Sequence, residues 1–426
     1  MKRSSALGAV FLCAAGLAAA GAASAQNVVI SNARIIVGNG QVIEKGSVVV
    51  QDGRIASVAP GAASSAPKGA VRIDGTGKTV MAGFTDVHRH LIQGRSPEQA
   101  QAFLKDQAAD RMRELLEAGF TTVQSGGDNN AAILELKKMV ESGQIKGPRI
   151  LASASIPGGP DVAPDAVRAA VRAAKASGAD SIAEVHYPRR EPPHPVTRHE
   201  TENLLAGLDE ARKAGIPFQI HAVSPDSMVA SAALGGIELI HTPHNDWVSE
   251  EQADSVREAG AMVGSCTGFG SPVFDVFNHD NKPTFRDGKP WPQGIVSNEG
   301  QGREAGLLPV NGRTLFDHGV VYAYCTDTNY NAVYGLYQEL KSLNLTFSPI
   351  DMVKVLGPNA ARFLGRDKDY GTVEPGKVAD LIVLGANPLV GFWNFITTEV
   401  VIKGGEVVLD KRGQPNAGEP MGKPRT

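Results

Sequence analysis

Both ends of the chain alternate hydrophobic and polar residues, and this pattern predicts antiparallel β-strands. The N-terminal part, from Asn27 to Pro60, contains NVVISNARIIV and SVVVQDGRIASV, with Gly and Asn at the turns. The same alternation returns near the C-terminus in GTVEPGKVADLIVLGANPL and EVVIKGGEVV. A period of two is typical of strands with one buried face. We therefore expect the two ends to form one small β-sandwich that is discontinuous in sequence.

The region between the two ends follows a different pattern. From Gly83 onward, helix-type stretches end at a Gly that leads directly into a short apolar segment, as in LLEAGFTTVQSGG and EARKAGIPFQIHAVS. Gly commonly ends a helix in the left-handed conformation. Repeated helix–Gly–strand units indicate parallel strands, and the segments FTDVHRH and PRILASAS complete a set of about eight, the number in a (β/α)8 barrel. The fold class predicted is therefore α/β, a TIM barrel with a small sandwich domain.

These patterns divide the chain into four segments. We expect a signal peptide over 1–25, the N-terminal part of the sandwich over 26–82, the barrel over 83–365, and the C-terminal part of the sandwich with a tail over 366–426. The segment from Gly268 to Leu308 interrupts the barrel between its seventh and eighth strands. It is rich in aromatic residues and proline, and a loop of this length is usually functional or disordered, so we expect an active-site lid.

The first 25 residues have the composition of a secretory signal. Lys2 and Arg3 precede an apolar run, and the small-residue triplet ASA ends at Ala25. A membrane helix is the weaker interpretation, because the run is shorter than the roughly 20 apolar residues that span a bilayer. Lipid attachment at Cys13 is also weak, since this residue lies within the apolar run. We therefore expect an exported protein, periplasmic or secreted, without a membrane anchor after cleavage.

Composition narrows the set of partners. The chain carries 42 basic against 45 acidic side chains, and no basic run stands out, so nucleic acid is not an expected partner. The partner expected is therefore a small-molecule substrate. The sequence is also compatible with a homo-oligomer. Beyond the leader the only cysteines are Cys266 and Cys325, too few for a disulfide framework. A disulfide between these two is compatible with neighbouring strands but is not indicated by spacing.

The polar residues at predicted strand ends carry the chemistry. In a TIM barrel the active site lies at the carboxyl ends of the strands. Here those ends supply ligand-type side chains from five separate strands: His88, His90, Glu184, His221, His241 and Asp327. Any one of them could be an ordinary hydrogen-bonded core residue. Their coincidence at one edge predicts a metal site.

Several motifs give the chain a family resemblance. It resembles the amidohydrolase superfamily, close to the imidazolonepropionase-like and exported prolidase-like branch. The matching pieces are GFTDVHRHL, EAGFTTVQSGG, IKGPRILAS, GIELIHTPH, CTDT, SPIDMVKVLGPNAARFLG and GTVEPGKVADLIVLGANPL. They cover essentially the whole mature chain and specify the family much better than the substrate.

The resemblance implies roles for the strand-end residues. His88 and His90 match the pair on the more buried metal, and Asp327 matches the aspartate that binds metal and handles protons. His221 and His241 match the histidines that hold the second metal in binuclear members. In mononuclear members the histidine at position 221 joins the first metal and the one at 241 faces the substrate. A divalent cation lowers the pKa of bound water, and Asp327 would then act as general base.

The fourth strand departs from the family pattern. The resembling branch has a carboxylated lysine there that bridges two metals, whereas this chain reads GADSIAEVH and places Ala183 at that position. Alternation along the strand turns Ala183 and Val185 toward the outer helices and Glu184 inward. We expect Glu184 to replace the lysine as a metal ligand. The alternative is a Glu paired with a nearby cation beside a mononuclear site.

Other residues near the strand ends have weaker assignments. His186 and Tyr187, and likewise His244 and Asn245, are either substrate contacts or loop residues. On the first strand, alternation places Asp86 on the same face as His88 and His90, and Arg89 on the outer face, toward the small domain. Cys325 is expected to line the pocket. Surface positions are expected for three further histidines: His194, His199 and His279.

The predicted function is a metal-dependent hydrolase acting on an amide or related C–N bond of a dipeptide or N-acyl amino acid. Its catalytic residues are Asp327 and His241, and its cofactor is one or two divalent ions, with zinc the default for these ligands. The alternatives are a mononuclear deaminase of a heterocyclic amine and a lactonase or carbamate hydrolase. A non-enzymatic alternative is an inactive barrel used as a binding module, which the full set of ligand-type residues argues against.

Overall fold

The computed structural model describes residues 26–63, 65–94, 96–157, 162–187, 197–270, 299–329 and 331–414. The predicted signal peptide, most of the segment between Gly268 and Leu308, and the C-terminal tail after residue 414 therefore lie outside the described residues. Within the described part, no helix combines the length and the apolar character that crossing a membrane would require.

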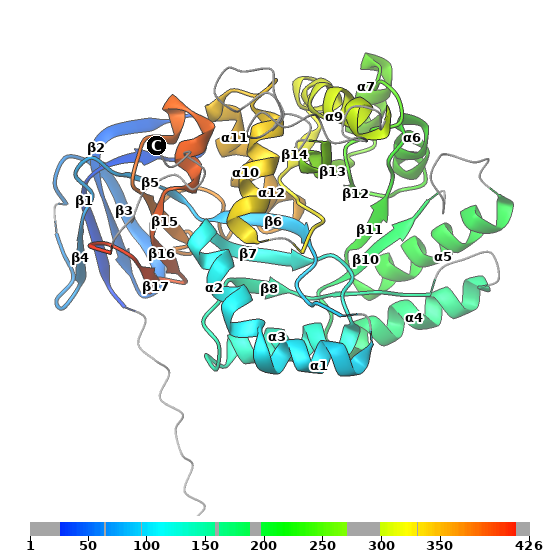
Figure 1. The fold of residues 1–426 in the computed structure, drawn as a ribbon, viewed down its shortest axis with the longest axis horizontal. Coiled ribbons are helices and arrows are strands. Elements are labelled where there is room, and N and C mark those ends of the chain that lie inside the picture. Colours follow the sequence, from blue (N-terminus) through cyan, green and yellow to red (C-terminus); the bar gives the residue numbers. More distant parts are fainter. Residues whose placement is uncertain are drawn as a thin grey trace, which may run out of the picture.

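The two ends of the chain share one sheet of eight strands, seen on the left of Figure 1. Its path is β17-β16-β15-β5-β1-β2-β3, with β4 paired to β1. The strands are β1 (Val28–Ile36), β2 (Val42–Gln51), β3 (Arg54–Pro60), β4 (Val71–Asp74), β5 (Thr79–Ala82), β15 (Leu381–Leu384), β16 (Thr398–Lys403) and β17 (Glu406–Asp410).

The pairing of β5 with β15 joins the N-terminal and C-terminal segments. These strands run antiparallel, with Val80 opposite Val383. Alternate side chains from strands at both ends of the sheet, such as Ile55 of β3 and Val400 of β16, pack into one core. The sheet thus folds around its own apolar interior, and this confirms the discontinuous sandwich domain.

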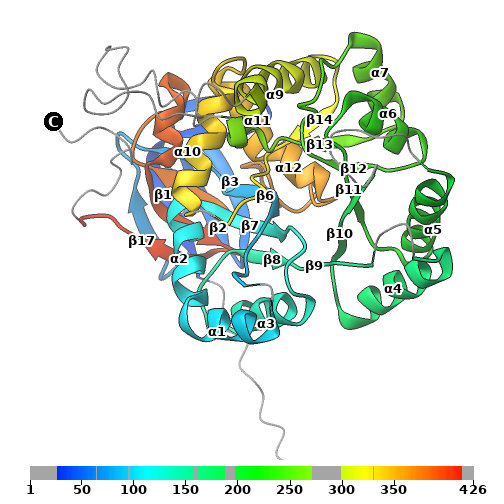
Figure 2. The same cartoon turned by 45° about the vertical axis from the view of Figure 1, so that its right-hand side comes forward.

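The middle of the chain forms the barrel, with helices around a ring of parallel strands (Figure 2). The strands are β6 (Phe84–Arg89), β7 (Phe120–Ser125), β8 (Arg149–Leu151), β9 (Ser153–Ala154), β10 (Ser181–His186), β11 (Phe218–His221), β12 (Glu238–Ile240), β13 (Met262–Gly264) and β14 (Val321–Ala323). They pair as β6-β7-β8 and β9-β10-β11-β12-β13-β14. Only Ala152 separates β8 from β9, and Val87 N–H donates to the Tyr324 carbonyl at 3.0 Å, which brings β6 back to the end of β14.

The helices cover the outside of this ring. They are α1 (Pro97–Asp106), α2 (Ala108–Ala118), α3 (Asn130–Glu141), α4 (Pro164–Ser177), α5 (Arg198–Ala214), α6 (Pro225–Ala233), α7 (Glu250–Glu258), α9 (Glu299–Asp317), α10 (Ala332–Leu343), α11 (Pro349–Leu356) and α12 (Pro358–Phe363). The short 3-10 helices are η1 (Thr267–Gly270), η3 (Pro388–Val390) and η4 (Phe392–Ile396).

The predicted helix–Gly–strand units are present. Helices α2, α4 and α5 each end at a glycine in the left-handed conformation: Gly119, Gly178 and Gly215. The next strand begins within one to three residues of each glycine. Such a short return leaves each strand parallel to the one before it. The (β/α)8 fold is thereby confirmed.

The lid prediction is partly wrong. The segment from Gly268 to Leu308 was expected to be a loop, but its last ten residues belong to α9, which begins at Glu299. Its first three residues lie in η1. Positions 271–298 lie outside the described residues, so the lid itself remains a prediction.

A disulfide joins the ends of the last two barrel strands. Cys266 follows β13, Cys325 follows β14, and the two half-cystines are bonded. Both are buried in the barrel interior, where they pack with Val87 and Ile240. The sequence left this bond open, and the structure places it two residues before Asp327.

Candidate metal centre

The six predicted site residues converge at the carboxyl ends of the strands. His88 lies in β6, Glu184 in β10 and His221 at the end of β11. His90 follows β6 and His241 follows β12, while Asp327 stands a few residues after β14. The structure therefore brings together residues that are up to 239 positions apart in sequence.

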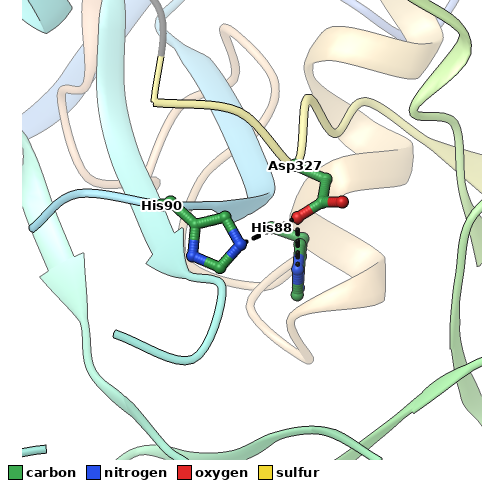
Figure 3. A group of neighbouring side chains, drawn as sticks. All are labelled: His88, His90 and Asp327. Atoms are coloured by element: carbon green, nitrogen blue, oxygen red, sulfur yellow. Dashed lines mark ion pairs between the residues drawn. The ribbon is translucent and has the colours of Figure 1, made fainter. Parts of the chain in front are cut away.

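One group of these residues forms around Asp327. Its Oδ1 atom lies 3.3 Å from Nε2 of His88 and 3.1 Å from Nε2 of His90. Figure 3 shows both rings directing this nitrogen toward the carboxylate. The three ligand atoms are close enough to share one metal ion.

A second group forms around Glu184. Its Oε2 atom lies 2.9 Å from Nδ1 of His221 and 3.5 Å from Nε2 of His241. Its other oxygen, Oε1, lies 3.7 Å from Nε2 of His88, which belongs to the first group. His241 also stands 3.6 Å from Asp327, so the two groups form one continuous constellation.

Several buried atoms of the site residues contact one another as ion pairs but make no hydrogen bond. Among the described residues, Nε2 of His88, Nε2 of His241 and Oδ1 of Asp327 are buried atoms that make no hydrogen bond. Buried polar atoms of this kind are costly and rare in native proteins. Imidazole nitrogen and carboxylate oxygen are the donors that divalent transition metals prefer. The residues present therefore fit the expected metal.

A β-bulge positions Glu184. In the pairing of β10 with β11, Ile182 lies opposite Phe218 and Val185 opposite Ile220, so β10 has one extra residue. The bulge interrupts the strict alternation expected for this strand, although Glu184 faces the site as predicted. Ile182 and Val185, three residues apart, both pack against the outer helices, and the carboxylate of Glu184 points to the histidines.

Two site residues adopt strained backbone conformations. His241 has φ of 79° and Asp327 has φ of 46°, in the left-handed region that non-glycine residues rarely occupy. The N–H of Asp327 donates to the carbonyl of His88 at 2.9 Å. This bond ties the end of the eighth strand to the first strand and fixes Asp327 beside His88. Such strain concentrates at functional sites.

Gln219 orients His88, and the sequence analysis missed it. Its Nε2 donates to the Val87 carbonyl at 3.2 Å, so its Oε1 is the atom that faces Nδ1 of His88 at 3.0 Å. Because that oxygen can only accept, Nδ1 carries the hydrogen and Nε2 is left to bind metal. Glu238, opposite Gln219 on β12, hydrogen-bonds the same amide. The feature of the sequence that could have revealed Gln219 is its position two residues before His221.

Asp128 supports His90 and was also missed. Its carboxylate accepts hydrogen bonds from the N–H groups of Leu91 and Ile92 at 3.0 to 3.2 Å. Its Oδ1 lies 3.6 Å from Nδ1 of His90, on the far side of the ring from Asp327. Asp128 therefore holds both the chain after β6 and the ring of His90. In sequence it directly follows the quoted motif VQSGG.

Gly126 leaves room for the ring of His88. A Cβ atom at this position would lie 2.8 Å from Nε2 of His88. Gly126 is also held by its N–H bond to the carbonyl of Arg89 at 2.8 Å. Only glycine fits here without displacing the nitrogen that faces Asp327.

The charges of the site are strongly coupled. Burial lowers the pKa of His88, but the nearby Glu184 and Asp327 outweigh burial and raise it to about 9. Contacts with Asp128 and Asp327 raise the pKa of His90 to about 10. Burial raises the pKa of Asp327, yet its contacts with His88 and His90 hold that pKa below the usual range. Without metal, the site is therefore a set of ion pairs, and a metal ion must displace protons to bind.

The expectation for the first strand was wrong in part. The register of β6 with β7 shifts between Asp86 and Arg89, so alternation does not hold there. Asp86 does not join the groups of possible metal ligands, and its carboxylate accepts hydrogen bonds from the Thr326 hydroxyl at 2.7 Å and from the backbone N–H of His88 at 3.2 Å. Arg89 is fully buried beside Gly335 of the outer helix α10 and donates to the same hydroxyl at 3.1 Å, while its orientation toward the small domain stays a prediction. Burial raises the pKa of Asp86 to about 6.

His186 and Tyr187, two of the weaker candidates, have different surroundings in the structure. The ring of His186 stacks on that of His221, with centroids 3.9 Å apart, and its Nε2 lies 4.0 Å from Glu184. Tyr187 is buried, and its hydroxyl bonds Thr201 at 3.1 Å.

The structure gives the following contacts for the remaining candidates. The N–H groups of His244 and Asn245 both donate to the carbonyl of Val223. His199 contacts the amide of Asn203 at 3.2 Å. His194 and His279 lie outside the described residues, and Cys325 is in the disulfide instead of being a free thiol.

The fold and the site together define a class of protein. A (β/α)8 barrel whose strand ends present four histidines and two carboxylates around one point is a metal-dependent hydrolase barrel. The model of the Amidohydrolase family matches residues 79–408, and the chain belongs to this family.

Comparison with individual proteins agrees with this family. An imidazolonepropionase of Alkaliphilus metalliredigens is 24% identical over 81% of this chain and 85% of its own length. One from Geobacillus thermodenitrificans is 33% identical, but the match spans only 25% of that protein and 23% of this chain. The first curated relatives are thus matched over about a quarter of their length.

Solved structures share the fold over nearly the whole chain. A proposed prolidase from Bifidobacterium longum is 26% identical, covers 91% of this chain and 96% of its own, and has a TM-score of 0.73. A Xaa-Pro dipeptidase with bound methionine is 22% identical, covers 90% of this chain and 99% of its own, and has a TM-score of 0.72.

Proposed function

We propose that this protein is an exported, metal-dependent amidohydrolase that hydrolyses an amide or related C–N bond of a dipeptide or N-acyl amino acid. The observation that carries the proposal is the gathering of histidine nitrogens and carboxylate oxygens within metal-binding distance of one another, including buried atoms of His88, His241 and Asp327 that make no hydrogen bond. The similarity to a proposed prolidase, a Xaa-Pro dipeptidase and imidazolonepropionases supports C–N bond hydrolysis.

Asp327 is the proposed general base. Its lowered pKa keeps it ionised at neutral pH, so it can accept a proton from the attacking water. The same carboxyl can then pass this proton to the leaving nitrogen as the C–N bond breaks. A bound divalent cation, zinc by the type of ligand, would activate that water and polarise the scissile carbonyl. His241 lies between Asp327 and Glu184, and in the mononuclear alternative it would face the reacting carbonyl.

Glu184 is the proposed substitute for the carboxylated lysine of the resembling branch. Its two oxygens face different histidines, His88 on one side and His221 with His241 on the other. A carboxylate placed in this way can bridge two ions. We therefore propose a binuclear centre in which His88, His90 and Asp327 hold one ion, and Glu184, His221 and His241 hold the other.

Export is supported by two independent features. The first 25 residues have the charged, apolar and small-residue order of a signal peptide. The disulfide between Cys266 and Cys325 is of a type that persists mainly in oxidising compartments. Mass spectrometry of protein recovered from the periplasm or medium is expected to show a mature N-terminus near Gln26. Intact Met1 on the recovered protein would contradict export by cleavage.

The activity is tested with metal-loaded protein against dipeptides and N-acyl amino acids. Release of the free amino acid is expected, with loss of turnover after chelation and recovery on adding Zn²⁺. Turnover that persists in fully metal-free protein would rule out this proposal.

A further inference from the structure

A pocket of about 340 Å³ opens beside the metal centre. It lies between the end of β10 and the helices α4 and α5, which run side by side outside that strand in Figure 2. Glu184 and His186 line this pocket and also belong, with His221, to a group that could hold a metal ion, so the pocket borders the site. Its volume is at the lower end of the roughly 300–1,000 Å³ of small-molecule pockets.

The far walls of the pocket are apolar. Ile156 and Pro157 follow β9 and form one wall, and three core residues form the rest: Val167 of α4, Leu204 of α5 and Phe218 of β11. Ile156 is half-buried, while the three core residues are almost fully buried. A cavity of this kind binds an apolar group by removing it from water.

The polar side chains of the pocket are engaged by the protein itself. The hydroxyl of Tyr187 bonds Thr201 at 3.1 Å, and the carboxylate of Glu200 accepts the N–H of Thr197 at 2.8 Å. The amide of Asn203 donates to the carbonyl of Val162 at 2.8 Å. These three side chains are held by contacts within the protein, and the apolar walls offer the surface by which the pocket would select its ligand.

The position of the pocket assigns it to one side of the scissile bond. In the ring of strands, β10 stands four places from β14 in either direction, so the pocket and Asp327 are on opposite sides of the barrel mouth. The leaving nitrogen must lie near Asp327 to receive its proton. The acyl group, on the other side of the carbonyl carbon, then points toward β10.

We propose that this pocket binds the acyl part of the substrate and selects a bulky apolar acyl group, such as an aromatic ring or a branched alkyl chain. The inference rests on the proposed amide hydrolysis. It narrows the substrate to N-acyl amino acids or dipeptides whose acyl side is large and uncharged. Hydrolysis would release the apolar carboxylic acid and the free amine.

The test compares N-acetyl-, N-butanoyl- and N-phenylacetyl-alanine, which share one leaving group. Metal-loaded wild type is expected to show kcat/KM at least about tenfold higher for the phenylacetyl than for the acetyl substrate. Ile156→Trp, which fills the pocket, is expected to lower that ratio at least about tenfold. Leu205→Trp is the matched control, since Leu205 is exposed on α5 next to Leu204 and the ratio should not change.

A second variant and a binding measurement distinguish a variant that fails to fold from a wrong pocket assignment and from a wrong proposed function. If Ile156→Trp does not fold, Val167→Ala should shift the preference toward still larger acyl groups. Calorimetry with phenylacetate and acetate tests the pocket without turnover, and phenylacetate should bind wild type more tightly. Equal kcat/KM across the acyl series, or equal binding of both acids, would overturn the pocket assignment. Absence of any amide hydrolysis with clear phenylacetate binding would instead overturn the proposed function.

Discussion

The Nδ1 atom of His88 lies 3.0 Å from Oε1 of Gln219, whose amide nitrogen is itself committed to the carbonyl of Val87. This relationship leaves Nε2 of His88 as the nitrogen available to a metal. We predict that Gln219→Met weakens metal binding by about 10- to 100-fold, because the ring loses the partner that fixes its tautomer and orientation. Competition with a chromogenic chelator measures the change.

The matched control for this variant is Gln101→Met. Gln101 is exposed on α1, and among its described contacts it bonds only Glu135. Its variant should bind metal like wild type. An unchanged metal affinity in Gln219→Met would show that packing alone orients His88.

Gly126→Ala is predicted to empty the site of the first metal without unfolding the barrel. The added methyl would stand 2.8 Å from Nε2 of His88, a ring that is fully buried and cannot swing away. Elemental analysis and thermal unfolding measure metal content and fold. Gly306→Ala, in open space on α9, is the control and should keep its metal. Full metal occupancy in Gly126→Ala would contradict the assignment of this nitrogen.

Glu184→Ala is predicted to lower the metal content from two ions per chain to one or none. The variant removes the proposed bridging carboxylate, whose two oxygens face His88 and His221. Elemental analysis of the mature protein gives the stoichiometry, and Glu202→Ala, on the exposed side of α5, is the control. One ion in both wild type and Glu184→Ala would place Glu184 on the substrate side and favour the mononuclear deaminase alternative.

Asp327→Asn is predicted to lower kcat by about 10² to 10⁴, the usual contribution of a general acid or base. An amide cannot accept the proton of the attacking water, although it keeps the size of the side chain. Because Asp327 is also a proposed ligand, metal content is measured on the same sample. Turnover at the wild-type rate in a metal-loaded variant would exclude the proposed proton transfer.

Glu238→Gln is predicted to stabilise the protein increasingly as the pH rises from 5 to 8. Burial raises the pKa of Glu238 from 4.5 to about 8, so its contribution to stability is complete below pH 4.5 and is lost as the pH rises toward 8. The loss is at most roughly 1.4 kcal/mol per pH unit. Urea unfolding of wild type and variant at several pH values measures it. A difference independent of pH would show that Glu238 is charged in the folded protein.

Local sequence signals were sufficient for the architecture. The glycines that end α2, α4 and α5 and the alternation at both ends of the chain depend on backbone preferences that act within a few residues. The strand-end histidines could be collected because parallel strands place their carboxyl ends at one edge. The helical start of α9 was missed, since its sequence EGQGREAGLLP has three glycines and a proline, residues that normally disfavour a helix.

The sequence by itself determined the fold class, the discontinuous sandwich and the identity of the six side chains at the strand ends. Tertiary structure decided how those side chains meet. Three features depend on contacts between segments that are distant in sequence: the bulge in β10 beside Glu184, the left-handed backbone at His241 and Asp327, and the support from Gln219 and Asp128. Periodicity describes one strand at a time, whereas register shifts and buried hydrogen bonds arise only when two strands pair.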